Sequence, residues 1–366
     1  MTTIRDIISL IEDFAPSALQ ESYDNCGLQV GDATLECTGA LLCVDARPEI
    51  VEEAKRKGLN LIICHHPLFF KGLKRIIGNT QVEKTAWAAI KHDIAIYASH
   101  TSLDNARGGV SFSMAEALGL NNIRFLSPQD DKILKLSVWI PRAHALDLRD
   151  QLFMAGCGQL GNYDNCSFSV EGTGTFRPLE GSCPADGTIN ALHSGEEVRL
   201  ELLLPRWIKS KVEETILLNH PYEEPAYEFS SVTIGTKSSG LGAVGELSSP
   251  ITAVSLIERI KSTFNSPVVR CNRFDIHTPV RKVALCGGSG SSFIENAIRE
   301  KAQVYITSDT GYHAFVDYAD KILIADIGHF ESENCAKNIF YGIIKEKFPN
   351  FAVEYSKTES NPIIYR

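Results

Sequence analysis

The sequence predicts an α/β protein whose mostly parallel sheets are flanked by helices, with a smaller α+β domain inserted near the middle. Short, continuous apolar runs alternate with helical patterns over residues 1–128 and 235–366, which is typical of parallel strands covered on both faces. Residues 129–234 follow a different pattern, with longer apolar or alternating runs that indicate antiparallel strands. The length of 366 residues also favours two or three domains.

Residues 1–128 form the first half of the predicted outer domain. An acidic amphipathic helix pattern opens the chain, and Pro48 suits the first turn of a later helix. Apolar runs predict strands at 40–45, 59–68 and 94–101. Helices are predicted over 1–16, from residue 47, over 80–91 and over 108–120.

Residues 235–366 repeat this alternation. A strand with a glycine turn is predicted at 282–290 and further strands at 303–309 and 321–328, with helices over 291–302 and 330–348. Because the two ends of the chain look alike, we expect them to share one sheet.

The middle segment, 129–234, is predicted to be the inserted domain. Strands are expected at 135–141 and 198–205 and helices at 146–156 and 209–219, an order that suits a ferredoxin-like unit. The Gly- and Ser-rich stretch 235–247 is interpreted as the linker back to the outer domain.

Composition excludes several classes of protein. The net charge of −9 argues against a broad basic surface for duplex nucleic acid, although a local basic groove stays open. No apolar run is long enough for a transmembrane helix, and the N-terminal pattern is not that of a signal peptide. The ten cysteines form no C-x-x-C pair, which favours buried, reduced thiols. A cytoplasmic protein is therefore expected.

Three predicted strands end in residues that can bind metals. His65-His66-Pro67 follows the apolar run Leu61-Ile62-Ile63, and ligands of open α/β sheets bind beyond the carboxyl ends of strands. Adjacent histidines there could each face a different metal ion. The alternative is one buried, hydrogen-bonded histidine beside an exposed one.

His100 lies at the end of the strand predicted at 94–101, and Asp104 follows this strand. An aspartate at this point could bridge two cations, or it could cap a helix or turn before Gly108-Gly109. After the strand at 321–328, His329 and Glu333 are four residues apart and share one helix face. Glu331 and Glu333 could instead be acids favoured by the helix dipole.

Together these strand ends offer three imidazoles and two carboxylates. Such a set suits a pair of Zn²⁺, Mn²⁺ or Fe²⁺ ions about 3.5–4 Å apart. The charge of two divalent ions exceeds that of two carboxylates, which favours hydroxide or an anionic substrate at the open positions. Metal-bound hydroxide near neutral pH would support hydrolysis.

Weaker features remain open. Gly287-Gly288-Ser289-Gly290 could cradle a phosphate or form a tight turn. His313 could be a proton shuttle or a structural histidine. Asp45 also ends a strand and could orient a ligand.

Several of these motifs resemble the NGG-interacting-factor-like family of dinuclear-metal proteins, whose members are often called GTP cyclohydrolase type 2 homologues. The matching residues are Tyr23-Asp24-Asn25-Cys26-Gly27, His65-His66-Pro67, His100-Thr101-Ser102-Leu103-Asp104, Gly287-Gly288-Ser289-Gly290, Thr307-Ser308-Asp309 with Tyr312-His313, and Gly328-His329 with Glu333. The resemblance implies that the ligands are His65, His66, Asp104, His329 and Glu333.

The insert resembles the long bacterial members of that family through Gly156-Cys157-Gly158-Gln159-Leu160-Gly161-Asn162, Gly172-Thr173-Gly174-Thr175-Phe176 and His220-Pro221-Tyr222-Glu223-Glu224-Pro225. The resemblance implies a PII/CutA-like fold for the insert and a toroidal homohexamer. Two departures occur: Cys64 stands where a small residue such as Ser is usual, and Thr310-Gly311 replaces a hydrophobic-Lys pair.

Two functions follow as expectations. The first is a metal-dependent hydrolase that opens the guanine ring of GTP or cleaves a phosphoester, with His100 or His313 moving protons. The second is a non-catalytic regulatory protein that senses ligands or metals and binds partners. Direct nucleic-acid binding ranks third because the chain is acidic.

Overall fold

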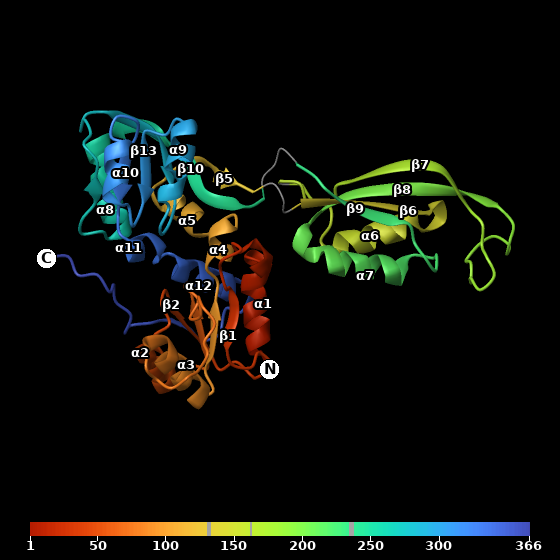
Figure 1. Ribbon diagram of the computed structural model, residues 1–366, viewed down its shortest axis with the longest axis horizontal. Coiled ribbons are helices and arrows are strands. Elements are labelled where there is room, and N and C mark those ends of the chain that lie inside the picture. The colour runs from red at the N-terminus through yellow and green to blue at the C-terminus, as the bar shows by residue number, and fades with distance from the viewer. Residues whose placement is uncertain (130–132, 162, 234–237) are drawn as a thin grey trace. The chain divides into compact units, whose positions relative to one another are not determined.

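The computed structural model describes residues 1–129, 133–161, 163–233 and 238–366. The chain divides into two compact units, each with its own core (Figure 1). Residues 1–128 and 239–366 form one unit, which we call the outer unit. Residues 129–238 form the other, which we call the inserted unit.

The first sheet of the outer unit has five strands in the order β1-β4-β3-β2-β15. Their bounds are Gly27–Val30 (β1), Ala40–Cys43 (β2), Leu61–Cys64 (β3), Ala95–Ala98 (β4) and Val353–Tyr355 (β15). All are parallel except β1, which pairs antiparallel with β4. Every residue of β2, β3 and β4 is buried, as expected for parallel strands that helices cover on both faces.

Four helices pack around this sheet: α1 (Ile4–Phe14), α2 (Pro48–Lys57), α3 (Gln81–Lys91) and α12 (Ala336–Lys347). Their ends follow from local chemistry. Thr3 and Asp6 form a capping box at the start of α1, and Pro48 occupies the first turn of α2. Gly58 ends α2 in a left-handed conformation, with a φ of 70°. Figure 1 shows α2 and α3 side by side near this sheet.

The second sheet of the outer unit has six strands in the order β11-β14-β13-β12-β10-β5. Their bounds are Asn121–Pro128 (β5), Gly240–Thr252 (β10), Arg270–Cys271 (β11), Pro279–Leu285 (β12), Val304–Thr307 (β13) and Leu323–Asp326 (β14). Only β12, β13 and β14 run parallel, and the others pair antiparallel. Helices α5 (Val110–Ala117), α8 (Ala253–Phe264), α9 (Ile294–Arg299) and α10 (Tyr312–Asp317) accompany it.

Three expectations require correction. The two ends of the chain do not share one sheet: they form two sheets that exchange one strand each, β15 and β5. The stretch 235–247 is not only a linker, since β10 begins at Gly240; residues 235–237 lie outside the described residues. The predicted helix over 330–348 is split into α11 (His329–Glu333) and α12.

The inserted unit has the element order β6-α6-β7-β8-α7-β9. The bounds are Ile133–Pro141 (β6), Ala145–Ala155 (α6), Ser167–Phe176 (β7), His193–Pro205 (β8), Lys209–Asn219 (α7) and Tyr227–Ser231 (β9). Its antiparallel sheet has the order β7-β8-β6-β9, and both helices share one core with it. The β-α-β-β-α-β order is that of a ferredoxin-like unit.

No helix in the described ranges combines the length and the apolar character that crossing a bilayer requires.

Candidate metal centre

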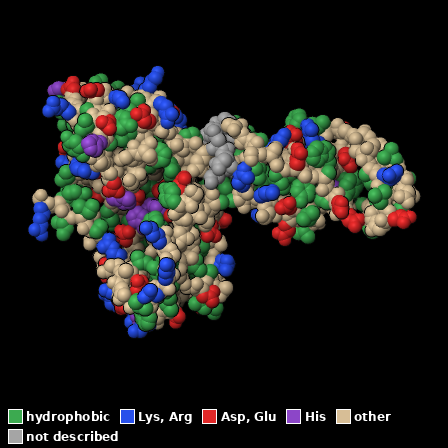
Figure 2. Space-filling model, viewed as in Figure 1, with side chains coloured by type: hydrophobic (Ala, Val, Ile, Leu, Met, Phe, Trp, Pro, Cys, Tyr) green, Lys and Arg blue, Asp and Glu red, His purple; other side chains and the backbone are tan. Residues whose placement is uncertain are grey.

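The residues predicted to bind metal lie at the carboxyl ends of strands from both sheets of the outer unit. Two follow β3, one lies in α4 (Thr101–Asn105) after β4, and two lie in α11 after β14. The structure brings all five together: His65, His66, Asp104, His329 and Glu333. Figure 2 shows histidine side chains gathered at a hollow on the outer unit.

His65 is fully buried, and only one of its two ring nitrogens has a hydrogen-bond partner. Its Nδ1 donates to the carbonyl oxygen of Ser99 at 2.9 Å, which leaves Nε2 as the acceptor nitrogen. No hydrogen-bond partner reaches Nε2. Oxygens of Asp104 and Glu333 each lie 3.8 Å away, too far for a hydrogen bond. A buried acceptor nitrogen that faces two carboxylates fits a divalent cation, because all three groups can bind the same ion.

His66 and His329 converge on the same carboxylate. Glu333 Oε2 lies 2.9 Å from Nε2 of His66 and 3.0 Å from Nε2 of His329, and the two nitrogens are 3.4 Å apart. Glu333 Oε1 faces His65 instead. Glu333 is thus the carboxylate in contact with all three imidazoles, a position that the sequence had suggested for Asp104.

Each of the four imidazoles contacts an acceptor with its Nδ1, so that its Nε2 is the nitrogen able to bind a metal ion. Three of the partners are carboxylates, and the fourth is a backbone carbonyl. The pairs are His65 with Ser99, His66 with Asp45, His100 with Asp24 and His329 with Asp309. Metal-binding histidines are held in this way, because the partner fixes the tautomer and raises the basicity of the ligand nitrogen.

The electrostatic field at the centre favours positive charge. Burial opposes protonation of His66, but the hydrogen bond to Asp45 and the close carboxylate of Glu333 outweigh it and raise its pKa to about 10. The carboxylate of Glu333 also raises the pKa of His329 to about 9. Burial would raise the pKa of Glu333, yet the imidazoles of His329 and His66 hold it well below its usual range. The donor set and this field therefore fit divalent cations.

Asp104 is the least stabilised carboxylate of the group. Burial raises its pKa to about 7, and the negative charge of Glu333 adds to this. A bound cation would reverse the effect, because it stabilises the ionised form.

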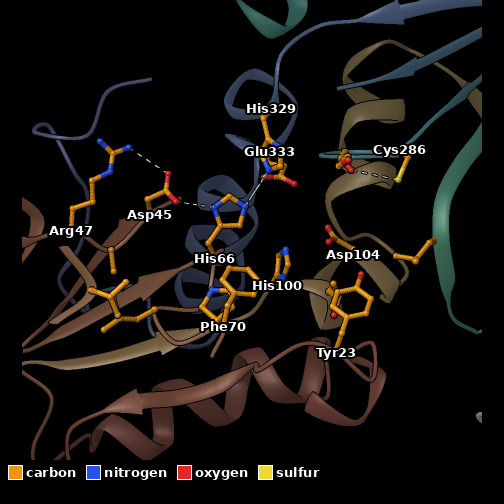
Figure 3. A pocket seen from close by; sticks show the side chains of 18 of the residues that line it. Tyr23, Asp45, Arg47, His66, Phe70, His100, Asp104, Cys286, His329 and Glu333 are labelled. Carbon is orange, nitrogen blue, oxygen red and sulfur yellow. Dashed lines mark hydrogen bonds and ion pairs between the residues drawn. The ribbon is translucent and has the colours of Figure 1, made fainter. Parts of the chain in front are cut away.

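A cavity of about 700 Å³ opens beside these side chains (Figure 3). His66, His100, Asp104, His329 and Glu333 line it, together with Tyr23, Phe70, Arg47 and Cys286. The guanidinium group of Arg47 lies 3.4 Å from Asp45, which in turn holds His66. The cavity therefore joins metal-binding groups to one cationic and several apolar side chains, and its volume suits a small-molecule ligand.

His100 and His313 were both considered for proton transfer, and the structure separates them. The ring of His100 lies 5.2 Å from that of His65 and 5.3 Å from that of His66. Its Nδ1 contacts Asp24, whose pKa lies well below the usual range because His100 and Thr101 donate to it. His313 is exposed on α10 and does not line the cavity.

The glycine-rich segment after β12 forms a tight turn. The N–H groups of Gly288 and Gly290 are occupied by the hydroxyls of Ser332 and Thr307, so they are not available to cradle a phosphate. Gly288 has a φ of 62°, and a Cβ there would lie 2.1 Å from Glu333 Oε1. This glycine allows the carboxylate to approach the turn closely.

Sequence reasoning missed Asp24 as the partner of His100, Asp309 as the partner of His329, and Arg47 as a cavity residue. Asp24 lies in one of the motifs that carry the resemblance, and Asp309 lies shortly after β13, which ends at Thr307, but neither residue had been assigned a role. Asp45, suggested as an orienting residue, does hold His66.

Comparisons with known proteins identify the family to which the chain is similar. The family model described as Duf34/NIF3 (NGG1p interacting factor 3) matches residues 2–362. A Halalkalibacterium halodurans protein named "GTP cyclohydrolase 1 type 2 homolog" is 37% identical over 88% of this chain and 87% of its own. A Bacillus subtilis protein of the same name is 34% identical over 99% and 98%. The solved structure of a Bacillus cereus protein related to NIF3 has a TM-score of 0.85 at 36% identity and covers 100% of this chain and 99% of that one.

Proposed function

Because this chain belongs to the Duf34/NIF3 (NGG1p interacting factor 3) family, we propose that it binds two divalent metal ions and is a metal-dependent hydrolase of a small anionic substrate. The observation that carries the proposal is the fully buried His65, whose Nε2 has no hydrogen-bond partner and faces two carboxylates at 3.8 Å. Such a nitrogen costs free energy until a hydrogen-bond donor or a cation binds it, and the two nearby carboxylates favour a cation.

The five ligands divide naturally around Glu333. His65 and Asp104 would hold one ion with Oε1 of Glu333, and His66 and His329 would hold the other with Oε2. The distances of 2.9 and 3.0 Å to Oε2 and of 3.8 Å to Oε1 support this division. Imidazole and carboxylate ligands suit Zn²⁺, Mn²⁺ or Fe²⁺.

A pair of such ions supplies Lewis acidity and lowers the pKa of a coordinated water. The remaining tasks belong to side chains of the cavity. Arg47 would attract and orient an anionic group, and Phe70 would form an apolar wall. His100, held at Nδ1 by Asp24, would accept or release a proton at Nε2. Proton transfer is proposed for His100 alone, because His313 does not line the cavity.

The substrate is proposed to be a nucleotide or another phosphoester. The name of the two bacterial relatives, "GTP cyclohydrolase 1 type 2 homolog", makes GTP the first compound to test. Assembly into a toroidal homohexamer and a cytoplasmic location are proposed as well. All ten cysteines are free, as in proteins of reducing compartments.

The test uses protein purified without a metal-affinity tag. Its metal content is measured by mass spectrometry, and the same sample is assayed against GTP, other nucleotides and phosphoesters. We expect about two ions per subunit and turnover that Asp104→Asn abolishes. Glu354→Asn, a change of an exposed carboxylate outside the cavity, is the control that should retain both.

A regulatory role is the second candidate function, and the inserted unit favours it because that unit contains a cavity of its own. In that case the protein would retain metal and bind an anionic compound without turning it over. Asp104→Asn would then change binding only. Metal-loaded protein without activity on any compound of the panel would refute the hydrolase and leave this role.

A further inference from the structure

The inserted unit contains a second cavity, of about 620 Å³, that none of the metal-binding side chains line. It lies at the end of the sheet where β7 ends, between the tip of β6 and the loop that leads into β9. The side chains that define its chemistry are Trp139, Phe176, Glu197, Tyr222, Glu223 and Glu224. It has the size of a small-molecule site.

Aromatic rings form one part of its wall. The rings of Phe176 and Tyr222 lie 5.4 Å apart in an edge-to-face arrangement, and Trp139 lines the same cavity. Burial and the hydrogen bond to Glu197 raise the pKa of Tyr222 to about 12, so its hydroxyl stays protonated. That hydroxyl donates to Glu197 Oε1 at 3.0 Å, which joins the aromatic wall to a carboxylate.

The loop that contains Tyr222 is fixed from behind by His220. The buried His220 donates from Nε2 to the carbonyl oxygen of Trp139 at 2.8 Å and accepts the N–H of Tyr222 at Nδ1, at 3.0 Å. Glu223 accepts the N–H of Cys183 at 2.8 Å and so ties a second loop to the cavity. The wall is therefore preorganised by contacts within the inserted unit.

The carboxylate of Glu197 occupies the space beside the backbone of Gly174. A Cβ on Gly174 would lie 2.2 Å from the carboxyl carbon of Glu197, so this carboxylate would have to shift if residue 174 had a side chain. The nearby Gly172 of the same strand has open space where a Cβ would be. This contrast provides a matched pair of substitutions.

From these contacts we propose that the cavity of the inserted unit binds a small organic cation with an ammonium or guanidinium group. Three carboxylates and one guanidinium group, that of Arg177, are among the described lining residues, so the charge favours cations. Aromatic faces attract the same groups through their quadrupoles. A nucleotide could stack on these rings, but its phosphates would face Glu197, Glu223 and Glu224.

Isothermal titration calorimetry of the full-length protein measures the binding of agmatine and spermidine, and ATP is titrated as the anionic ligand for comparison. A blocked arginine peptide is titrated too, because it distinguishes a free amine from a side chain of a protein partner. Saturable binding of agmatine or spermidine is expected. Gly174→Ala and Glu197→Gln should each weaken it about tenfold, the loss of one charge-assisted contact.

Gly172→Ala should bind as the unchanged protein does, and so should His65→Ala, which alters only the metal centre. Circular dichroism checks that each variant is folded. The proposal would be overturned if no cation showed saturable binding, or if ATP bound more tightly than the cations. It would also be overturned if folded Gly174→Ala and Glu197→Gln bound the cations as tightly as the unchanged protein does. If the arginine peptide binds more tightly than agmatine and spermidine, the cation that the cavity binds is a side chain of a basic protein segment.

Discussion

At the scale of single residues, the metal centre depends on the acceptors that hold its histidines. Asp309 accepts from Nδ1 of His329 at 2.6 Å and lies outside the ligand set. It also has a φ of 53°, in the left-handed region. Asn adopts this conformation readily and Ala does not, so Asn is the substitution that tests the hydrogen bond without backbone strain.

We expect Asp309→Asn to weaken metal binding by about 10–100-fold, the usual effect of removing a carboxylate partner from a ligand histidine. The neutral amide no longer favours the tautomer with a free Nε2. A competition titration with a chelating dye measures the change.

Asp93→Asn is the control, because Asp93 is an exposed aspartate with nearly the same φ, 52°, away from the centre. Its metal affinity should equal that of the unchanged protein. Equal affinity in Asp309→Asn would mean that His329 is not a ligand or is held by other contacts.

The five proposed ligands could be chosen from the sequence because each follows a buried strand within seven residues. Their partners could not be assigned, since pairing depends on how distant segments meet. Asp24 is 76 residues from His100, and no local pattern joins them. Asp45 was the exception, because it ends a predicted strand and had been suggested to orient a ligand.

At the scale of elements, the main error was the stretch 235–247, where glycine was taken as the mark of a linker. In β10 the glycines allow the neighbouring strands to pack closely against the backbone. A Cβ on Gly240 would lie 2.5 Å from the carbonyl oxygen of Ser127, and one on Gly242 would lie 2.9 Å from that of Leu285. Both neighbours belong to strands that pair with β10. Only knowledge of those strands distinguishes a packed glycine from a flexible one.

Helix α2 also holds the last segment of the chain. The carboxylate of Glu53, only 2% exposed, accepts from the hydroxyl of Ser356 and from the N–H groups of Lys357 and Thr358. Burial would raise its pKa, but these bonds lower it to about 2. We expect Glu53→Gln to reduce the free energy of unfolding by about 1–3 kcal/mol at pH 7.

The pH dependence of this loss has a definite sign. Because the pKa of Glu53 in the folded protein lies below that of an unfolded glutamate, its contribution is present above about pH 4.3 and disappears as the pH falls toward 2. Denaturant unfolding of the unchanged protein and of Glu53→Gln should show that their difference in the free energy of unfolding becomes smaller from pH 7 to pH 3. Glu52→Gln, at an exposed position of the same helix, should have the same free energy of unfolding as the unchanged protein. A difference that widens on acidification would contradict the assignment.

At the scale of the whole molecule, local patterns could not reveal that the outer unit has two sheets. β5 precedes the inserted unit but joins the sheet of β10 to β14, and β15 joins the sheet of β1 to β4. Both exchanges are long-range pairings that strand periodicity does not specify. The candidate metal centre lies where strand ends of these two sheets meet, so strand periodicity alone could not define it.

The same topology predicts that the inserted unit can be removed. Pro128 and Gly240 are Cα partners in the antiparallel pair of β5 and β10, so a short Gly-Ser linker can close the gap as a hairpin loop. A chain in which such a linker replaces residues 129–238 should fold and retain its metal, since every proposed ligand lies in the outer unit. Metal analysis and thermal unfolding test this. His65→Ala in the shortened chain should lower the metal content, as it should in the full chain. If the shortened chain folds but binds no metal, the centre requires the inserted unit. Part of the stability of the centre would then come from the assembled protein and not from the outer unit alone.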